Sequence, residues 1–594
     1  MGIEKKETTI TRTLVITIFV TSLLILGIAY AIGGLPQSAG NQDGSMQQDQ
    51  GTSIEDTPTK ETPPVDEYEI KAQAKSAQHI YWELPEGLSD NFSLDLLIDE
   101  PYGLAVGTPT MAAGYLQTEY RFPLNITLDD RHVATAEVCM RYIENGDLLY
   151  FFSGGEADIS DGDVLRLRWN VTERTIDPSR EVSYITYGEK IDNATSQWVH
   201  QLLPVYASAL AEGMTVELPM ASMYTDKIRF GIVDVFTKLE NNVFVEHIDL
   251  STVNQVTVFD NRNVWTAELP LYDQGLQMQT EHWGVLSGDL LFNGNAESKD
   301  YEDIRVADLD RFRKMRVDGI YYEVPDSYVP YEPRAFWRVP AEHIGQRFIR
   351  SIREQEESGE RKYSSSYLET LAIASMNHSL GQQTDGGYWL TLPQSNWLYG
   401  DYGVAAGFYD TRFSTDAALF LLDMSQSYDL PEVFEAVTDY ADFLLWYAEN
   451  HSFETENGGV LIEDYFHPTI AHQPTHVSLN HLVTEMNFLL LYDKELRRQQ
   501  GAQIDEAYLQ LAGKIRQAVY DTGLAWVKEN ADLWYAYLPD GTYGLQDYPH
   551  LTRNDLRLSV SLMQDHWEDT EDNMFRKLIY YKERYLKENG FPMW

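Results

Sequence analysis

The sequence predicts a multidomain α+β protein with an N-terminal transmembrane helix, a middle region rich in β-sandwich strands and a C-terminal (α/α) toroid. Residues 13–35 contain no charged side chain, which suits a membrane-spanning helix. Segments between residues 67 and 328 alternate apolar and polar residues, as half-buried strands do. Segments after residue 340 repeat apolar residues three and four positions apart, as amphipathic helices do. A chain of 594 residues also exceeds one ordinary core, so several domains are expected.

The N-terminal segment predicts a single-pass anchor in the cell membrane. A helix over residues 13–35 is long enough to cross a bilayer, and Leu, Ile and Val dominate it. Lysines and an arginine precede it within residues 1–12, so the positive-inside rule leaves these residues in the cytoplasm and the folded part extracellular. A cleavable signal peptide is the alternative, because residues 29–31 form an A-x-A site. Both interpretations predict an exported protein.

Two further regions precede the helices. Residues 36–66 predict a disordered linker, because they contain almost no large apolar residue and cannot bury enough surface to fold. Residues 67–328 predict one or two antiparallel β-sandwiches, since short alternating runs are separated by Gly, Asp and Asn turns. The alternation breaks over residues 191–212, where a helix is the expected alternative.

Residues 329–594 predict a helical domain. Their amphipathic segments are joined by aromatic, Gly-rich and Pro-rich loops, a pattern that favours paired helices in an incomplete (α/α) toroid. Polysaccharide lyases and several glycosidases share that architecture, so the fold alone does not choose an activity. The predicted helices span residues 341–357, 366–380, 415–429, 431–450, 477–499, 505–521 and 575–589.

Charge and cysteine content exclude some classes of function. A formal net charge of −47 argues against nucleic-acid binding, which needs a basic surface. The single cysteine, Cys139, excludes an intramolecular disulfide. It lies in an alternating run, VATAEVCMRYIE, which predicts a buried and inert thiol.

Two clusters of side chains suit proton transfer on a polar substrate. Residues 534–558 concentrate tyrosines and a histidine before a C-terminal helix. Packing is the more frequent use of such tyrosines. Four histidines, His467, His472, His476 and His481, form the second cluster. Imidazole binds zinc well, but the sequence contains no H-E-x-x-H motif, so no metal or other cofactor is predicted.

Four segments, in the same order, resemble the C-terminal catalytic domain of the D-glucuronyl C5-epimerases. They are GFYDTRFSTDAALFLLDMSQSYD from Gly407, EDYFHP from Glu463, VSLNHLVTEMNFLLLYDKEL from Val477 and DYPHLTRNDLRL from Asp547. The resemblance covers roughly the last 200 residues of the chain. The chain departs from the family at its second segment, which inserts two residues before Pro468, and has no Tyr-Asp-Leu-Arg match in its WYAY stretch.

The resemblance implies an α/α barrel, an acidic polysaccharide substrate and conversion of D-glucuronate to L-iduronate by two-sided proton transfer at C5. The matched positions imply catalytic roles for Glu463, Tyr465 and Tyr548. Tyr537 is the favoured match for the remaining tyrosine, with Tyr535 as the alternative.

Four further residues are candidates for substrate binding: His467, His476, Arg553 and Asn554. Arg553 precedes a helix-like segment and would supply positive charge to a substrate carboxylate. A uronate polysaccharide lyase, which shares the proton-abstraction step, and a non-catalytic cell-surface glycan-binding protein are the alternatives. A homodimer is left open.

Overall fold

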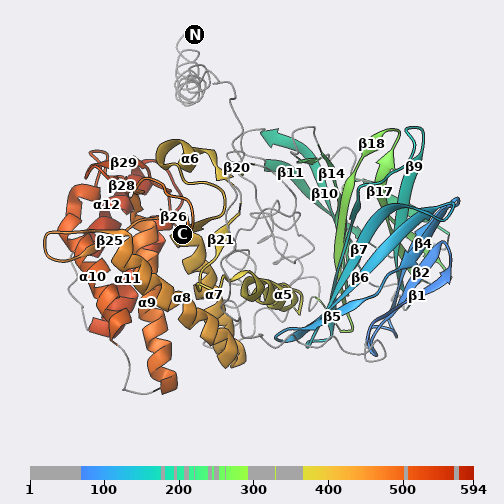
Figure 1. Ribbon diagram of the computed structural model, residues 1–594, viewed down its shortest axis with the longest axis horizontal. Coiled ribbons are helices and arrows are strands. Elements are labelled where there is room, and N and C mark those ends of the chain that lie inside the picture. The colour runs from blue at the N-terminus through green and yellow to red at the C-terminus, as the bar shows by residue number, and fades with distance from the viewer. Residues whose placement is uncertain are drawn as a thin grey trace, which may run out of the picture. The chain divides into compact units, whose positions relative to one another are not determined.

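The computed structural model describes residues 69–174, 181–192, 197–206, 213–219, 221–225, 227–238, 244–246, 253–260, 262–289, 291, 328–329, 366–392, 394–500, 506–567 and 574–593 (Figure 1). The predicted membrane helix at 13–35, the predicted linker at 36–66 and the predicted helix at 341–357 lie outside these residues. Within the described ranges, no helix is both long and apolar enough to span a membrane.

Two antiparallel sheets account for the β-rich part, as described up to residue 291. The first runs in the order β1 (Lys71–Ser76), β2 (His79–Glu83), β3 (Phe92–Ile98), β9 (Val164–Glu173), β17 (Arg262–Asp273), β16 (Val253–Phe259) and β12 (Thr215–Pro219), with β18 (Leu276–Gln277) paired to β17.

The second sheet runs β11 (Gln197–Tyr206), β10 (Glu181–Asp192), β13 (Ala221–Tyr224), β14 (Ile228–Lys238), β19 (Gln279–Ser287), β8 (Asp147–Gly155), β7 (Arg131–Ile143), β6 (Gln117–Leu128) and β4 (Tyr102–Val106). In addition, β15 (Phe244–Glu246) pairs with β14, and β5 (Thr110–Ala113) pairs with β6.

The two sheets share one apolar core. In β3 every second residue is buried, beginning with Phe92, so one face of the strand points inward. Aromatic residues of the two sheets meet in this core: the ring centroids of Trp82 and Phe122 are 6.2 Å apart, and those of Tyr150 and Trp169 are 5.0 Å apart. The predicted antiparallel sandwich is therefore confirmed for the described strands.

The helix considered as an alternative within residues 191–212 is absent where that range is described, at residues 191–192 and 197–206. Strand β11 pairs antiparallel with β10 there, with Glu181 opposite Tyr206. Periodicity does not distinguish a short apolar strand from a buried helix, and pairing with a neighbour decides the outcome. The prediction for Cys139 is confirmed, since it lies buried in β7 and burial raises the pKa of its thiol to about 12.

Helices dominate the described residues from 366 onward. They are α5 (Ser366–Gln382), α6 (Asn396–Tyr402), α7 (Thr411–Tyr428), α8 (Pro431–Asn450), α9 (Leu479–Gln500), α10 (Ala507–Thr522), α11 (Leu551–Trp567) and α12 (Met574–Glu588), with the short 3₁₀ helix η5 (Gly523–Trp526). Neighbouring helices pack in pairs, α7 with α8, α9 with α10 and α11 with α12 (Figure 1). Paired helices are what the toroid prediction requires, and closure into a ring stays a prediction.

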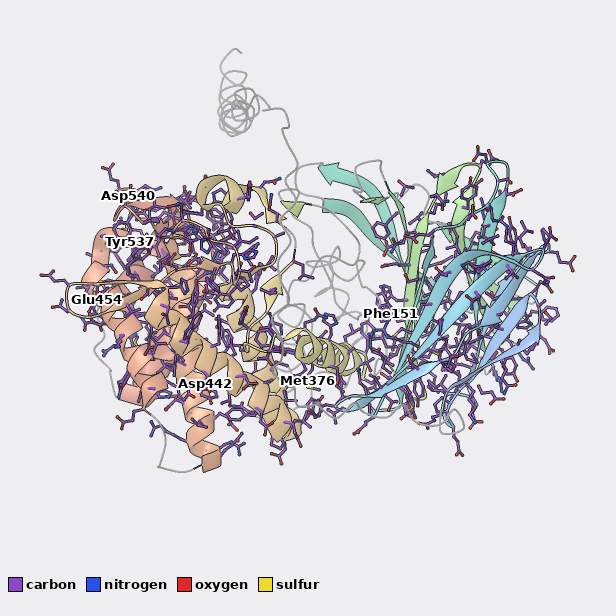
Figure 2. The ribbon with its side chains drawn as sticks, in the orientation of Figure 1. Phe151, Met376, Asp442, Glu454, Tyr537 and Asp540 are labelled. Carbon is purple, nitrogen blue, oxygen red and sulfur yellow. The ribbon has the colours of Figure 1, made fainter. Side chains whose placement is uncertain are left out.

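Helix α5 contacts the second sheet. The Thr370 hydroxyl donates to the Asp147 carboxylate at 2.7 Å, and the Asn377 amide donates to the carbonyl oxygen of Tyr115 at 2.8 Å. Phe151 of β8 belongs to the same apolar cluster as Leu371 of α5. Figure 2 labels Phe151 on the sheet and Met376 on α5. The domain boundary predicted between residues 328 and 329 stays a prediction.

Short strand pairs connect the helices and position their loops. They form four small sheets: β20 (Tyr328–Val329) with β22 (Gln394–Ser395), β21 (Leu390–Thr391) with β23 (Phe408–Asp410) and β26 (Tyr465–Phe466), β24 (Ser452–Glu454) with β25 (Val460–Ile462), and β27 (Val477–Ser478) with β28 (Trp534–Tyr537) and β29 (Tyr543–Gln546).

Candidate active site

The candidate site lies where two of the small sheets bring distant parts of the chain together. In one sheet Asp410 of β23 pairs with Tyr465 of β26. In the other, Ser478 of β27 pairs with Ala536 of β28. Because β26 and β27 are only eleven residues apart along the chain, counted from Phe466 to Val477, the two sheets are linked through one loop. That loop carries two of the predicted site residues, His467 and His476, and Glu463 and Tyr465 lie just before it.

Asp464 is at the centre of the site and is fully buried. Its Oδ1 accepts a hydrogen bond from the Ser478 main-chain N–H at 2.8 Å, and its Oδ2 accepts from the Ser478 hydroxyl. Two imidazoles are also close to Oδ2, with Nε2 of His476 at 3.3 Å and Nδ1 of His481 at 3.6 Å. Burial raises the pKa of Asp464 well above its usual value, with Asp410 and Glu463 adding repulsion. The carboxyl is therefore disposed to hold a proton.

His476 is enclosed by aromatic rings and has an exposed fraction of 0%. Its ring centroid lies 5.3 Å from that of Trp397, 5.5 Å from those of Tyr402 and Tyr465, and 5.9 Å from that of Tyr535. Its Nδ1 is 3.0 Å from the Tyr402 hydroxyl. Burial lowers the pKa of His476 to about 4, so the imidazole is neutral at neutral pH. The sequence predicted that His476 binds substrate. In the structure its ring is enclosed, and its polar neighbours are Tyr402 and Asp464.

Glu463 faces an open pocket of about 350 Å³ and is 8% exposed. Its Oε2 accepts a hydrogen bond from the Thr475 main-chain N–H at 2.5 Å. Burial raises the pKa of this carboxyl, so it exchanges protons closer to neutral pH than an exposed glutamate does. The other residues lining the pocket are His451, Phe466, His467, Pro468, Thr469, Ile470, Ala471, His472 and Pro474.

Three tyrosines surround the buried polar groups. The Tyr465 ring centroid is 5.9 Å from that of His481, and the Tyr535 centroid is 6.5 Å from it. Burial and the neighbouring Asp464 raise the pKa of Tyr535 well above its usual value. Tyr548 is 54% exposed, and its ring lies 5.7 Å from that of Tyr535. The structure thus brings Tyr465, Tyr535 and Tyr548 together.

Tyr537 is not part of this group. Its ring lies further along β28, 6.1 Å from Phe453 and 5.5 Å from Tyr543. Figure 2 shows Tyr537 near the labelled Glu454 and Asp540, which belong to β24 and to the turn after β28. Of the two tyrosines considered from the sequence, the alternative Tyr535 packs against His476 and His481, whereas the ring of the favoured Tyr537 packs against Phe453 and Tyr543.

His467 has a structural role in the pocket wall. Its Nδ1 accepts hydrogen bonds from the main-chain N–H groups of Thr469 and Ile470, at 3.2 and 3.0 Å. Its Nε2 is 3.0 Å from the carbonyl oxygen of Ala406, to which it donates in the matching tautomer. Both ring nitrogens are therefore committed to the main chain, which fixes the loop shape. The predicted role in substrate binding is limited to lining the pocket.

Arg553 and Asn554 lie in the first turn of α11 and bond to each other. The Nε and Nη2 groups of Arg553 donate to Oδ1 of Asn554 at 3.1 and 2.8 Å. Arg553 is buried, and burial together with Arg557 lowers the pKa of its guanidinium. The sequence predicted that Arg553 supplies positive charge to a substrate carboxylate, and that role stays a prediction.

A buried ion cluster anchors the segment that carries Tyr548. The Lys582 ammonium lies 2.6 Å from Asp532 and 2.6 Å from Asp547, and all three side chains are at most 1% exposed. The Thr552 hydroxyl adds a hydrogen bond to Asp547 at 2.6 Å. Because Asp547 immediately precedes Tyr548, this cluster fixes the position of the tyrosine beside Tyr535.

Sequence reasoning missed several residues of the site. Tyr402 and Trp397 lie on the short helix α6, and no motif marked them. Glu485 of α9 is fully buried, and burial raises the pKa of its carboxyl well above its usual value, with Asp464 adding repulsion. A glutamate among the apolar residues of α9 is the signal that could have indicated it. Among the described residues, no group of three or more His, Cys, Asp or Glu side chains is arranged to hold a metal.

Comparisons with known proteins give limited information. No protein-family model matches the sequence, and no curated protein matches it. The chain is similar to solved structures of carbohydrate-active enzymes. One is a D-mannose isomerase, at 12% identity over 50% of this chain and 71% of that chain, with a TM-score of 0.33. Others are an α-amylase from Clostridium perfringens, at 13% identity over 48% and 70% with a TM-score of 0.30, and a GH76 α-mannanase from Bacteroides thetaiotaomicron, at 14% identity over 49% and 70% with a TM-score of 0.32. These TM-scores are too low for the likeness to carry an argument about this chain.

Proposed function

We propose that this protein is an exported, membrane-tethered enzyme that epimerises D-glucuronate to L-iduronate at C5 within a polysaccharide. One observation carries the proposal. Tyr465 and Tyr535 come from different strands and flank the same buried histidines, beside a glutamate that opens to a pocket. Inversion at C5 needs one group to remove a proton and another to return one to the opposite face of the ring. Converging proton-transfer groups of this kind support that reaction.

The protonation states support an acidic substrate. Burial raises the pKa values of Glu463, which lines the pocket, and of the adjacent, fully buried Asp464, which favours less negative charge at the site. A protonated carboxyl can also donate a hydrogen bond to that carboxylate. This local effect supports an acidic substrate at the site, although the formal net charge of the chain is −47.

Exposed aromatic rings around the site support a sugar ligand. Trp397 is 39% exposed beside His476, and Trp446 is 46% exposed with its ring 6.2 Å from the pocket residue Phe466. Tyr548 is exposed on the Tyr535 side. Aromatic faces give apolar contact area to a ligand while neighbouring polar groups fix its orientation. Several such rings suit successive rings of a polymer.

The decisive experiment is NMR of an unsulfated glucuronate polymer, such as heparosan, incubated with the full-length protein in deuterated water. We expect deuterium at C5, new iduronate signals and an unchanged chain length. Unsaturated chain ends would indicate a lyase instead. Binding without deuterium exchange in any uronate polymer would indicate a non-catalytic glycan-binding protein.

The Tyr548→Phe variant tests the site, because it keeps the ring and removes only the hydroxyl. We expect at least a tenfold loss of iduronate formation, as is typical when a proton-transfer group is removed. Tyr580→Phe is the matched control, since Tyr580 is also highly exposed but lies on α12 beside Tyr581. Equal rates in the two variants would remove Tyr548 from the mechanism.

The membrane tether is tested by fractionation. We expect the full-length protein to stay with membranes after an alkaline wash and a variant lacking residues 1–35 to be released, because residues 13–35 are the uncharged stretch. Release of the full-length protein in this wash would contradict the tether and leave the proposed reaction untouched.

A further inference from the structure

His476 cannot act on a substrate directly in this structure, because four aromatic rings enclose it and its exposed fraction is 0%. A neutral imidazole that contacts both a hydroxyl and a carboxyl can nevertheless pass a proton between them. The hydroxyl belongs to Tyr402, at 3.0 Å from Nδ1, and the carboxyl to Asp464, at 3.3 Å from Nε2. The three side chains therefore form a row that begins at a buried acid, with the Asp464 carboxyl close to Nε2 but not aligned with it as a hydrogen bond in this structure.

Tyr402 is the half-buried end of this row. It is the last residue of α6, which is capped at both ends: the Ser395 hydroxyl accepts from the Leu398 N–H at 3.4 Å, and Gly403 adopts a left-handed conformation with φ of 76°. Such a conformation favours glycine, which has no Cβ to clash with the main chain. The buried Leu398 holds the helix to the protein. The Tyr402 hydroxyl is thus held in place by a fixed short helix.

Tyr402 also adjoins the pocket that Glu463 faces. Its carbonyl oxygen accepts a hydrogen bond from the Gln473 N–H at 2.9 Å. The neighbours of Gln473 in the chain, His472 and Pro474, both line the pocket. The end of α6 is therefore fixed to the loop that forms the pocket wall.

We propose that Tyr402 is the general acid of this site and that Asp464 and His476 position and resupply its proton. The inference rests on the proposed function, for which it identifies one of the two proton-transfer groups. Tyr402 gives its hydroxyl proton to the C5 carbanion, so a C–H bond forms and the O–H bond breaks. The Nδ1 proton of His476 moves to the Tyr402 oxygen, and the proton of Asp464 moves to Nε2. The negative charge ends on the Asp464 carboxylate.

The surroundings of each group suit its part in this relay. The Ser478 N–H and hydroxyl both donate to Asp464 and stabilise the carboxylate that forms. Burial lowers the pKa of His476 to about 4, so the resting imidazole is neutral, and burial raises the pKa of Asp464, which favours its protonated form. Burial, with Asp401 and Asp464, raises the pKa of Tyr402 to about 12, which keeps its hydroxyl protonated before the transfer. A phenol remains a far stronger acid than a carbon alpha to a carboxylate, so the transfer is downhill.

The Tyr402→Phe variant of the full-length protein tests the acid in deuterated water with heparosan. We expect iduronate formation to fall at least 100-fold while deuterium still enters C5 of glucuronate at more than a tenth of the normal rate. The reason is that the base on the other face still removes and returns a proton there. Tyr399→Phe, on the same helix and 54% exposed, is the matched control and should retain both activities. A normal epimerisation rate in Tyr402→Phe, or the loss of exchange together with epimerisation, would overturn the proposal.

A second measurement is independent of the substrate. In protein labelled with ¹⁵N-histidine, the resonances of His476 are assigned by their loss in His476→Gln. We expect Tyr402→Phe to shift the Nδ1 resonance, because it removes the hydroxyl that contacts this nitrogen, and Tyr399→Phe to leave it unchanged. An unchanged Nδ1 resonance in Tyr402→Phe would overturn the relay. If the unaltered protein exchanges no proton of any uronate polymer, the proposed function fails. The NMR measurement on His476 then still tests whether Tyr402, His476 and Asp464 are coupled.

Discussion

The sandwich and the helical part bury carboxyl groups in opposite ways. In the sandwich, Glu119 lies between two arginines, with Oε1 2.6 Å from Arg121 and Oε2 2.8 Å from Arg141. Burial acts against the ionised form, but the two guanidinium groups outweigh it and lower the pKa of Glu119. Asp464 in the helical part is instead surrounded by a serine, two histidines and other acids, and its pKa is raised. A carboxyl paired with arginine stabilises the fold, whereas one that keeps its proton is available for chemistry.

The sharpest test of this difference exchanges each acid for its amide. We expect Asp464→Asn to lower epimerisation by 100-fold or more, as removal of a proton-transfer group does. We expect its stability to stay within about 1 kcal/mol, because a neutral amide replaces a largely neutral acid. Activity assays and urea unfolding of the same samples measure the two effects.

Glu119→Gln is the matched control for that variant. It should keep full activity and lose about 1–3 kcal/mol of stability, because Arg141, which is 3% exposed, loses its charged partner. If Asp464→Asn were instead the destabilised and active variant, the contrast between the two regions would be wrong.

The helical part also contains carboxyl groups that are paired with a buried cation, because Lys582 lies between Asp532 and Asp547. Lys582→Met leaves Asp532 and Asp547 without their shared ammonium, and we expect a loss of about 3–5 kcal/mol in the free energy of unfolding. A triple variant, Lys582→Met with Asp532→Asn and Asp547→Asn, should recover much of the lost free energy of unfolding. Equal stability of the two variants in urea would show that the ion cluster does not depend on charge pairing.

The buried histidine gives the helical part a distinct pH dependence. The pKa of His476 is lowered from 6.5 to about 4. The unfolded chain therefore binds a proton between these values that the folded chain does not, and stability falls as pH decreases from about 6.5 towards 4. One pKa unit corresponds to 1.36 kcal/mol, so His476 contributes up to roughly 3 kcal/mol of this loss.

His476→Gln removes this contribution. We expect the fall in its unfolding free energy between pH 6.5 and pH 4 to be smaller than that of the unaltered protein by that amount. The other side chains with ionisable groups that face His476 are common to both proteins: Tyr402, Asp464, Tyr465, His481 and Tyr535. The same pH slope in both proteins would show that His476 is not held neutral by burial.

The smallest expected effect concerns Trp397, which is 39% exposed. If its ring contacts a sugar, Trp397→Ala should raise the KM for a glucuronate polymer about tenfold with little change in kcat, because the contact is present in ground state and transition state alike. Trp446 is also exposed and lies near the pocket, so Trp446→Ala is the companion variant for the same kinetic measurement. A fall in kcat without a change in KM would indicate that Trp397 acts by covering His476 instead.

Local patterns were sufficient for most of the regular structure. Alternating residues in β3 and β9 bury one face of each strand, and that period does not depend on distant contacts. The helical spacing of α8 is equally local, and Pro431 sits in its first turn, where a missing N–H costs nothing. The helix alternative at β11 stayed open in the sequence because an apolar run is compatible with both structures, and only its partner β10 selected the strand.

The site could be predicted only in part. The order of the motifs indicated Glu463, Tyr465 and Tyr548. Two small sheets bring Tyr465 and Tyr535 to the same histidines, and Tyr548 packs against Tyr535. The choice between Tyr535 and Tyr537 depended on position along β28, which no local pattern fixes. Residues that are 74 positions apart, such as Tyr402 and His476, become neighbours only when α6 packs against the loop after β26.

The sequence by itself determined the periodicity of strands and helices, the strong negative charge and the supply of tyrosines and histidines near residue 463. Those properties follow from side-chain chemistry and from spacing along the chain. The tertiary structure decided which of these groups are buried, and burial decided their protonation. Asp464 gains its raised pKa and His476 its lowered one because folding removes both from water without an arginine or lysine among the causes of either shift. Desolvation depends on every neighbour in space, and the order of residues in the chain does not record it.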